Sequence, residues 1–99
     1  MIKHIIIWDL KQELSSEEKI EAAAKIKHDL EMLVDKIDGI KELKVITELL
    51  SSSNGSIMLD STFDDENALD EYAVHPEHLK VKEYISTVVC GRKCADYII

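Results

Sequence analysis

Apolar residues alternate along the first segment after Met1 in a way that predicts a strand. Ile2–Leu10 is short and rich in branched and aromatic residues, which favours extended backbone. Because successive side chains of a strand point to opposite faces, one face carries Ile2, His4, Ile6, Trp8 and Leu10. The other face carries Ile5 and Ile7 as well. We therefore expect helices to cover one face and a second copy of the chain to cover the other.

The next apolar residues recur at helical spacing and predict a long helix. Ser15 and Glu18 match a capping box, which marks the start of this helix. The stripe that should face the core consists of Ala22, Ile26, Leu30, Leu33 and Ile37. Asp38-Gly39 is the expected stop, and His28 falls on the polar side of the helix, where we expect it to be solvated.

Two strands and a connecting turn are predicted in the middle of the chain. Residues 40–50 form the second strand and residues 56–63 the third. The serine-rich loop between them ends in Asn54-Gly55, a dipeptide that favours the positive φ angles of a hairpin turn.

A proline divides the helical residues that follow. Asp64-Asp65-Glu66 offers a cap and an acidic first turn for a short helix that should end near Val74. Pro76 is favoured in a first turn and predicts a new helix from there to about Val88. Residues 90–99 then form a last strand. The order β-α-β-β-α-β predicts a ferredoxin-like α+β fold over residues 1–99, with an antiparallel sheet and both helices on one face.

Composition narrows the classes of partner. The 99 residues are enough for one domain, and 20 acidic against 12 basic side chains give a net charge of −8. Nucleic acid and anionic lipid are therefore not expected partners, because both bind through basic residues. The longest apolar run, Ile5 to Trp8, is too short to cross a membrane, so we expect a cytoplasmic protein. Cys90 and Cys94 are expected to be free thiols.

The segment around Pro76 contains the candidate chemistry. Tyr72 lies on the outgoing helix and His78 on the first turn of the incoming one, so both side chains can point into the angle between the helices. A histidine base beside a tyrosine hydroxyl suits proton abstraction next to a carbonyl. His75 precedes a proline, is restricted to extended backbone, and is expected to act as an N-cap. The alternative is that Tyr72 and His78 only pack the helix junction.

Other sites are less well supported by the pattern. A zinc site of His75 and His78 with Glu71 or Glu77 lacks a familiar ligand spacing, so no metal is expected. Cys94 could be a nucleophile if its pKa were lowered, but Arg92 is the only basic residue nearby on the same strand face. We therefore interpret Cys94 as an inert thiol. His4, on an apolar strand face, is interpreted either as a core histidine or as part of the pocket wall.

The chain resembles the stress-responsive α/β-barrel (Dabb) family over its whole length. The resemblance rests on Lys3-His4 in the first strand, on Phe63, on the segment from Tyr72 to His78, and on Asp96-Tyr97. It implies a homodimer in which two four-stranded sheets close into a barrel. Plant polyketide cyclases of this family use a tyrosine and a histidine that match Tyr72 and His78, and a histidine matching His4 lines their pocket. Where those cyclases place aromatic residues in the first helix, this chain has Ala22, Ala23 and Ile26.

The function predicted from these features is that of a small homodimeric stress-responsive barrel protein with an apolar pocket between sheet and helices. His78 and Tyr72 would catalyse cyclisation or isomerisation of a carbonyl compound without metal or organic cofactor. The residues expected to line the pocket or bind the ligand are His4, His75, Ile6, Trp8 and Ile26. Two alternatives are a non-catalytic structural or ligand-binding dimer and, on fold analogy alone, a cofactor-free monooxygenase.

Overall fold

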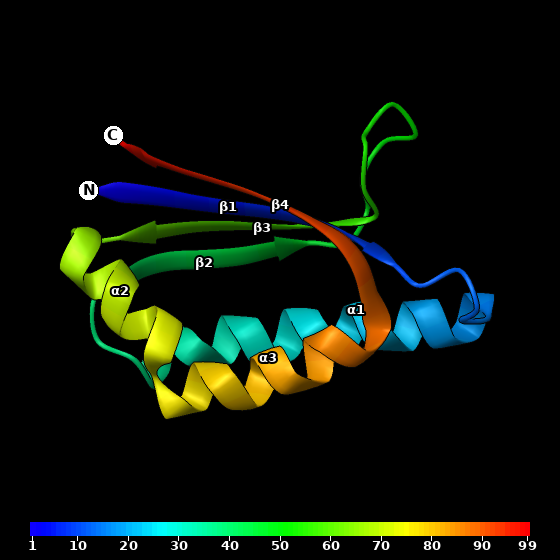
Figure 1. Cartoon of the computed structure of the whole chain (residues 1–99), viewed down its shortest axis with the longest axis horizontal. Coiled ribbons are helices and arrows are strands. Elements are labelled where there is room, and N and C mark those ends of the chain that lie inside the picture. The colour runs from blue at the N-terminus through cyan, green and yellow to red at the C-terminus, as the bar shows by residue number, and fades with distance from the viewer.

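The computed structural model describes residues 1–99 and has two layers, a four-stranded sheet and a layer of helices on one of its faces (Figure 1). The strands are β1 (Ile2–Leu10), β2 (Ile40–Ile46), β3 (Ile57–Phe63) and β4 (Val89–Ile98). They pair antiparallel in the order β2-β3-β1-β4. The predicted ferredoxin-like α+β fold is therefore confirmed.

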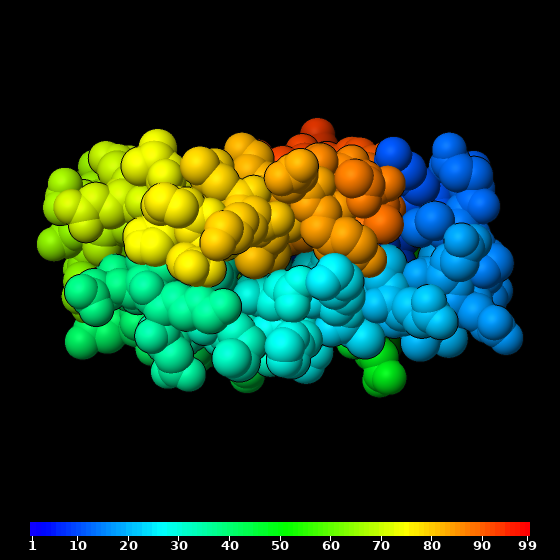
Figure 2. Space-filling view, turned by 90° about the horizontal axis from the view of Figure 1, so that it is seen from below, coloured from blue at the N-terminus to red at the C-terminus, as the bar shows by residue number.

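The helix layer consists of α1 (Ser16–Glu31), the 3₁₀ turn η1 (Met32–Asp35), α2 (Glu66–Val74) and α3 (Pro76–Val88). Seen from the helix side, α1 and α3 lie against each other along the molecule and hide most of the sheet (Figure 2). No helix has both the length and the apolar character that a membrane crossing needs.

The two faces of β1 differ as the sequence predicted. The face that carries Ile6 and Trp8 is buried under the helices, and those residues are at most 6% exposed. Ile5 and Ile7, on the opposite face, are only half-buried in the single chain. In Figure 1 no helix covers that outer face of the sheet.

The first helix begins as predicted and ends earlier than predicted. The Ser15 hydroxyl accepts a hydrogen bond from the Glu18 amide at 3.1 Å, and the Glu18 carboxylate accepts one from the Ser15 amide at 2.8 Å. The α-helix stops at Glu31 and tightens into η1, although Leu33 and Ile37 are still buried. The chain turns at Gly39, whose φ of 92° suits glycine.

The prediction for the connection between β2 and β3 was wrong in two respects. Strand β2 ends at Ile46 rather than residue 50, because β3 offers no paired residue beyond Met58, and Leu50 is 80% exposed. Asn54-Gly55 does not adopt positive φ, so it is not a primed hairpin turn. Glycine at position 55 instead lets the loop lie close to β1. A Cβ at this position would be 2.3 Å from Cγ2 of Ile7 and 3.0 Å from the Trp8 carbonyl oxygen.

Replacing Gly55 should therefore destabilise the fold through a clash with β1. We expect Gly55→Ala to lower the free energy of unfolding by about 1–3 kcal/mol, as overpacking does elsewhere. The neighbouring exposed variant Asn54→Ala should change it by less than about 0.5 kcal/mol. Urea unfolding of both variants measures the difference, and equal stability of the two would contradict the close approach.

Candidate functional site

The break between α2 and α3 positions the tyrosine and histidine predicted from the sequence. His75 has extended backbone, and its Nδ1 accepts a hydrogen bond from the Glu77 amide at 3.1 Å, so it caps α3 as expected. Pro76 occupies the first turn of α3. The Tyr72 and His78 rings stack with centroids 4.1 Å apart and planes at 29°. The change of direction at Pro76 thus brings the two candidate side chains into contact.

A cavity of about 220 Å³ lies between the sheet and the α2–α3 segment. Both Tyr72 and His78 line it, and so do three of the residues expected in its wall, His4, Ile6 and Trp8. The wall is mostly hydrophobic and is completed by Leu30, Leu59, Leu69, Ala73, Lys82, Ile85, Ser86, Val89 and Arg92.

Two residues expected in the pocket wall lie elsewhere. Ile26 is fully buried in the core and does not line the cavity. The His75 side chain is held by its cap on α3 and is not part of the cavity wall. Both positions are explained by local geometry: the helical stripe packs against the sheet, and the residue before a proline turns toward the helix start.

The Tyr72 hydroxyl is the most unusual polar group of the site. Tyr72 is 2% exposed, and its hydroxyl oxygen is buried without any hydrogen-bond partner. Burial raises the pKa of Tyr72 well above its ordinary value, so the phenol keeps its proton at neutral pH. The hydroxyl is therefore a hydrogen-bond donor without an acceptor, on a residue that lines a mostly apolar cavity. Leaving such a group unpaired costs about 1–3 kcal/mol.

The surroundings of His78 favour its neutral imidazole. Burial lowers its pKa below the ordinary value and the charges of Lys82 and His4 act in the same direction, whereas the contact with the Ala73 carbonyl raises it. Its Nδ1 lies 3.4 Å from the Ala73 carbonyl oxygen. A proton on Nδ1 would donate to that carbonyl and leave Nε2 with a free lone pair, which is the tautomer that a general base requires.

His4 brings a carboxylate to the site that sequence spacing did not reveal. Its Nδ1 lies 2.5 Å from a carboxylate oxygen of Asp96, and the two residues are directly paired across β1 and β4. The His4 ring also meets the Tyr72 ring edge-on at 6.3 Å between centroids. In the sequence Asp96 stands out only as part of a family motif, because 92 positions separate it from His4.

Cys94 also lies next to His4, and the sequence alone did not predict this contact. Its Sγ lies 3.9 Å from Nδ1 of His4 and 3.6 Å from the Asp96 carboxylate. Burial raises the pKa of Cys94, and the Asp96 charge raises it further. A thiol with a raised pKa is a poor nucleophile, in agreement with the inert thiol expected from the sequence. Both cysteines are free.

Together, the fold and the site define a ferredoxin-like α+β protein with a pocket between its sheet and its helices. The model of the Stress Responsive A/B Barrel Domain family matches residues 2–99, and the chain belongs to this family. No curated protein matches the chain at a significant level.

Solved structures show the same fold. A dimeric protein of unknown function with a ferredoxin-like fold from Bacteroides fragilis is 30% identical, with a TM-score of 0.92 over 99% of this chain and 95% of that one. A Dabb family protein from Mesorhizobium loti is 21% identical, with a TM-score of 0.76 over 99% and 95%. The hydroxynitrile lyase from Passiflora edulis is 22% identical, with a TM-score of 0.80 over 99% and 92%.

The lowered pKa of His78 predicts a pH dependence of stability. In the unfolded chain His78 binds a proton near pH 6.5, whereas the folded protein resists that proton, so stability falls as the pH drops below about 6.5 and is constant above it. We expect His78→Asn to make this acid-side slope shallower. His28→Asn, at an exposed histidine, is the control and should leave the slope unchanged. Urea midpoints between about pH 5 and pH 8 measure both, and parallel curves for His78→Asn and the wild type would contradict the burial effect.

Proposed function

We propose that the cavity binds a small carbonyl compound and that His78 and Tyr72 act on it as an acid/base pair. The observation that carries the proposal is that Tyr72 lines the cavity and that its buried hydroxyl has no hydrogen-bond partner within the protein. A carbonyl oxygen of a ligand would accept its hydrogen bond. Because the walls are mostly apolar, the rest of the ligand should be apolar and small.

The chemistry follows from the protonation states of the two groups. Nε2 of His78 takes a proton from the carbon next to the carbonyl, and the C–H electron pair moves to form an enolate whose negative charge lies on the oxygen. The Tyr72 hydroxyl donates to that oxygen, and it does so without itself ionising because burial raises its pKa. If the enolate is conjugated with a C=C bond, return of the proton from His78 to the far (γ) carbon gives isomerisation. Attack of the enolate carbon on a second carbonyl of the same molecule gives cyclisation, and the proton on His78 then passes to the new alkoxide oxygen.

The surrounding residues support this arrangement. Stacking on Tyr72 fixes the plane of the His78 ring, and the Ala73 carbonyl favours the tautomer with a free Nε2. Lys82 and Arg92, also in the cavity wall, would stabilise negative charge on a bound enolate. The hydroxynitrile lyase from Passiflora edulis supports an enzymatic use of this fold. A non-catalytic ligand-binding protein is the alternative, since an apolar cavity suits binding alone.

Substitution of either residue should abolish catalysis and leave the protein folded. With a poly-β-keto compound as substrate, we expect His78→Ala to lower kcat/KM by about 10²–10⁴-fold. Tyr72→Phe should lower it by about 10²–10³-fold, because one hydrogen bond to the developing oxyanion is lost. Stopped or continuous assays of product formation give these values.

Matched variants separate catalysis from folding. Tyr84→Phe and His28→Ala, at positions outside the cavity wall, should keep wild-type activity. Tyr72→Phe should melt at or above the wild-type temperature, because its hydroxyl makes no hydrogen bond that could be lost. Retained activity in both His78→Ala and Tyr72→Phe would remove the catalytic assignment. A wild-type protein that binds the compound without turning it over would instead identify a non-catalytic binding protein.

We further propose that the chain is a homodimer that closes a barrel through the outer face of the sheet. An apolar row crosses this face from Ile46 through Met58 to Ile7, three residues aligned by the strand register and only half-buried in the single chain. Ile5 is half-buried beside it. The related structure from Bacteroides fragilis is described as dimeric. A cytoplasmic location is also proposed, because both cysteines are unpaired and free thiols persist in reducing compartments.

A charge on the outer face should break this dimer. We expect Ile7→Glu, and likewise Ile5→Glu, to weaken association by about 3–5 kcal/mol, since an unpaired charge would be buried between the sheets. Ile20→Glu is the matched control, because Ile20 is 70% exposed on α1. Sedimentation equilibrium of the three variants and the wild type measures the effect. A wild-type protein that stays monomeric at high concentration would refute the shared sheet.

A further inference from the structure

We propose that His4, Cys94 and Asp96 form a binding site for a zinc ion, distinct from the Tyr72–His78 pair. One ligand atom from each of the three residues lies within 4.8 Å of the other two. Nitrogen, sulfur and oxygen donors together suit a borderline-soft ion such as Zn²⁺, whose sites commonly combine histidine, cysteine and carboxylate ligands.

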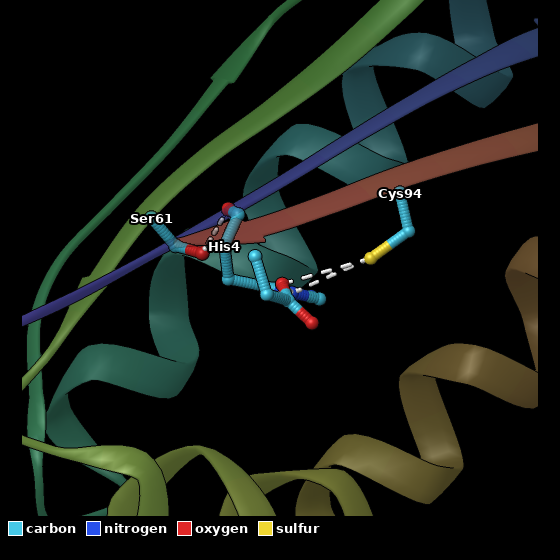
Figure 3. A network of polar contacts seen from close by, with 4 residues as sticks. His4, Ser61 and Cys94 are labelled. Carbon is cyan, nitrogen blue, oxygen red and sulfur yellow. Dashed lines mark hydrogen bonds and ion pairs between the residues drawn. The ribbon is translucent and has the colours of Figure 1, made fainter. Parts of the chain in front are cut away.

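The sheet holds the three ligands on one face. Asp96 is paired with His4 across β1 and β4, and Cys94 is paired with Ile6, so His4, Cys94 and Asp96 all project to the helix side. Figure 3 shows the side chains of His4 and Cys94 approaching each other from these two strands. The Ser61 hydroxyl donates to the His4 carbonyl oxygen at 2.7 Å and secures the backbone of β1 beneath the site. Ligands on paired strands are better fixed than ligands on loops.

Distances between the donor atoms are close to those of a tetrahedral site. With usual zinc bond lengths, two ligand atoms of a tetrahedral site lie about 3.3–3.6 Å apart. The Cys94 Sγ already lies 3.6 Å from the Asp96 carboxylate and 3.9 Å from Nδ1 of His4. The 2.5 Å between Nδ1 and the carboxylate must open by about 0.8 Å when an ion replaces the proton there. Asp96 can make this movement, because its side chain is 44% exposed.

The surroundings favour a cation and leave one coordination position for a small ligand. A second cavity adjoins Asp96 and is also lined by the acidic residues Glu66 and Asp70. His4 lines the first cavity and Asp96 the second, so the cluster lies where the two cavities meet, and Leu69 lines both. Arg92, on the same face of β4, interacts with the Cys94 side chain, and its charge acts against a bound cation. Three protein ligands with an open fourth position is the arrangement that catalytic zinc sites use.

Cobalt(II), a spectroscopic substitute for zinc, tests the site on the reduced, tag-free protein. We expect one equivalent of Co²⁺ to give a thiolate-to-cobalt charge-transfer band in the near ultraviolet, and Zn²⁺ to displace it. Cys94→Ser should remove the band. Cys90→Ser should keep the band. Cys90 lies on the same strand as Cys94, but its thiol hydrogen-bonds to the Leu10 carbonyl and not to the proposed ligands.

Calorimetric titration with Zn²⁺ tests the Asp96 ligand and gives a second test of Cys94. Asp96→Asn and Cys94→Ser should each weaken zinc binding by at least about tenfold, whereas His28→Gln, at the exposed histidine beside Asp29, should leave it unchanged. Wild-type affinity in either ligand variant, or no cobalt band in the wild type, would overturn the site. Neither measurement needs a substrate, so the result is independent of the acid/base function proposed for Tyr72 and His78.

Discussion

The position of β1 at the centre of the sheet is the constraint on which the rest of the structure depends. Its inner face supplies buried residues to the core and at the same time places His4 beside Asp96 on one neighbouring strand and Ser61 on the other. A shift of one residue in this register would turn every side chain of β1 to the opposite face. Packing of the apolar residues against the helices therefore also fixes the one histidine of β1 in the wall of the cavity.

The second constraint is the break at Pro76, which converts one helical segment into two with different directions. An uninterrupted helix would carry Tyr72 and His78 on faces about 120° apart, given six residues at 100° each. The extended His75 and the new start at Pro76 remove this separation and let the two rings stack. His75 caps the start of α3 and so fixes where this helix begins. Although His75 does not line the cavity, it therefore helps to determine the cavity's geometry.

The sequence predicted the fold better than it predicted the site. Period-two and helical patterns, the capping box at Ser15 and the break at Pro76 are local signals, and each was confirmed by the structure. The errors lie where a local signal competes with a distant contact: Asn54-Gly55 satisfies the rule for a primed turn, but Ile7 and Trp8 of a strand far away in sequence require the glycine for space. For the same reason Asp96 and Cys94 could not be placed beside His4, since only the register of β4 brings them there.

The site combines polar groups with an environment that does not fully satisfy them. The Tyr72 hydroxyl lacks a partner and His78 is kept neutral by burial, so each group lowers stability relative to an apolar side chain of the same shape. His4 is treated differently, because Asp96 satisfies its Nδ1 directly. A core under selection for stability alone would replace Tyr72 by phenylalanine at no loss of packing. The unpaired hydroxyl is thus a polar group that packing alone does not explain, and the proposal of a ligand in this cavity rests on it.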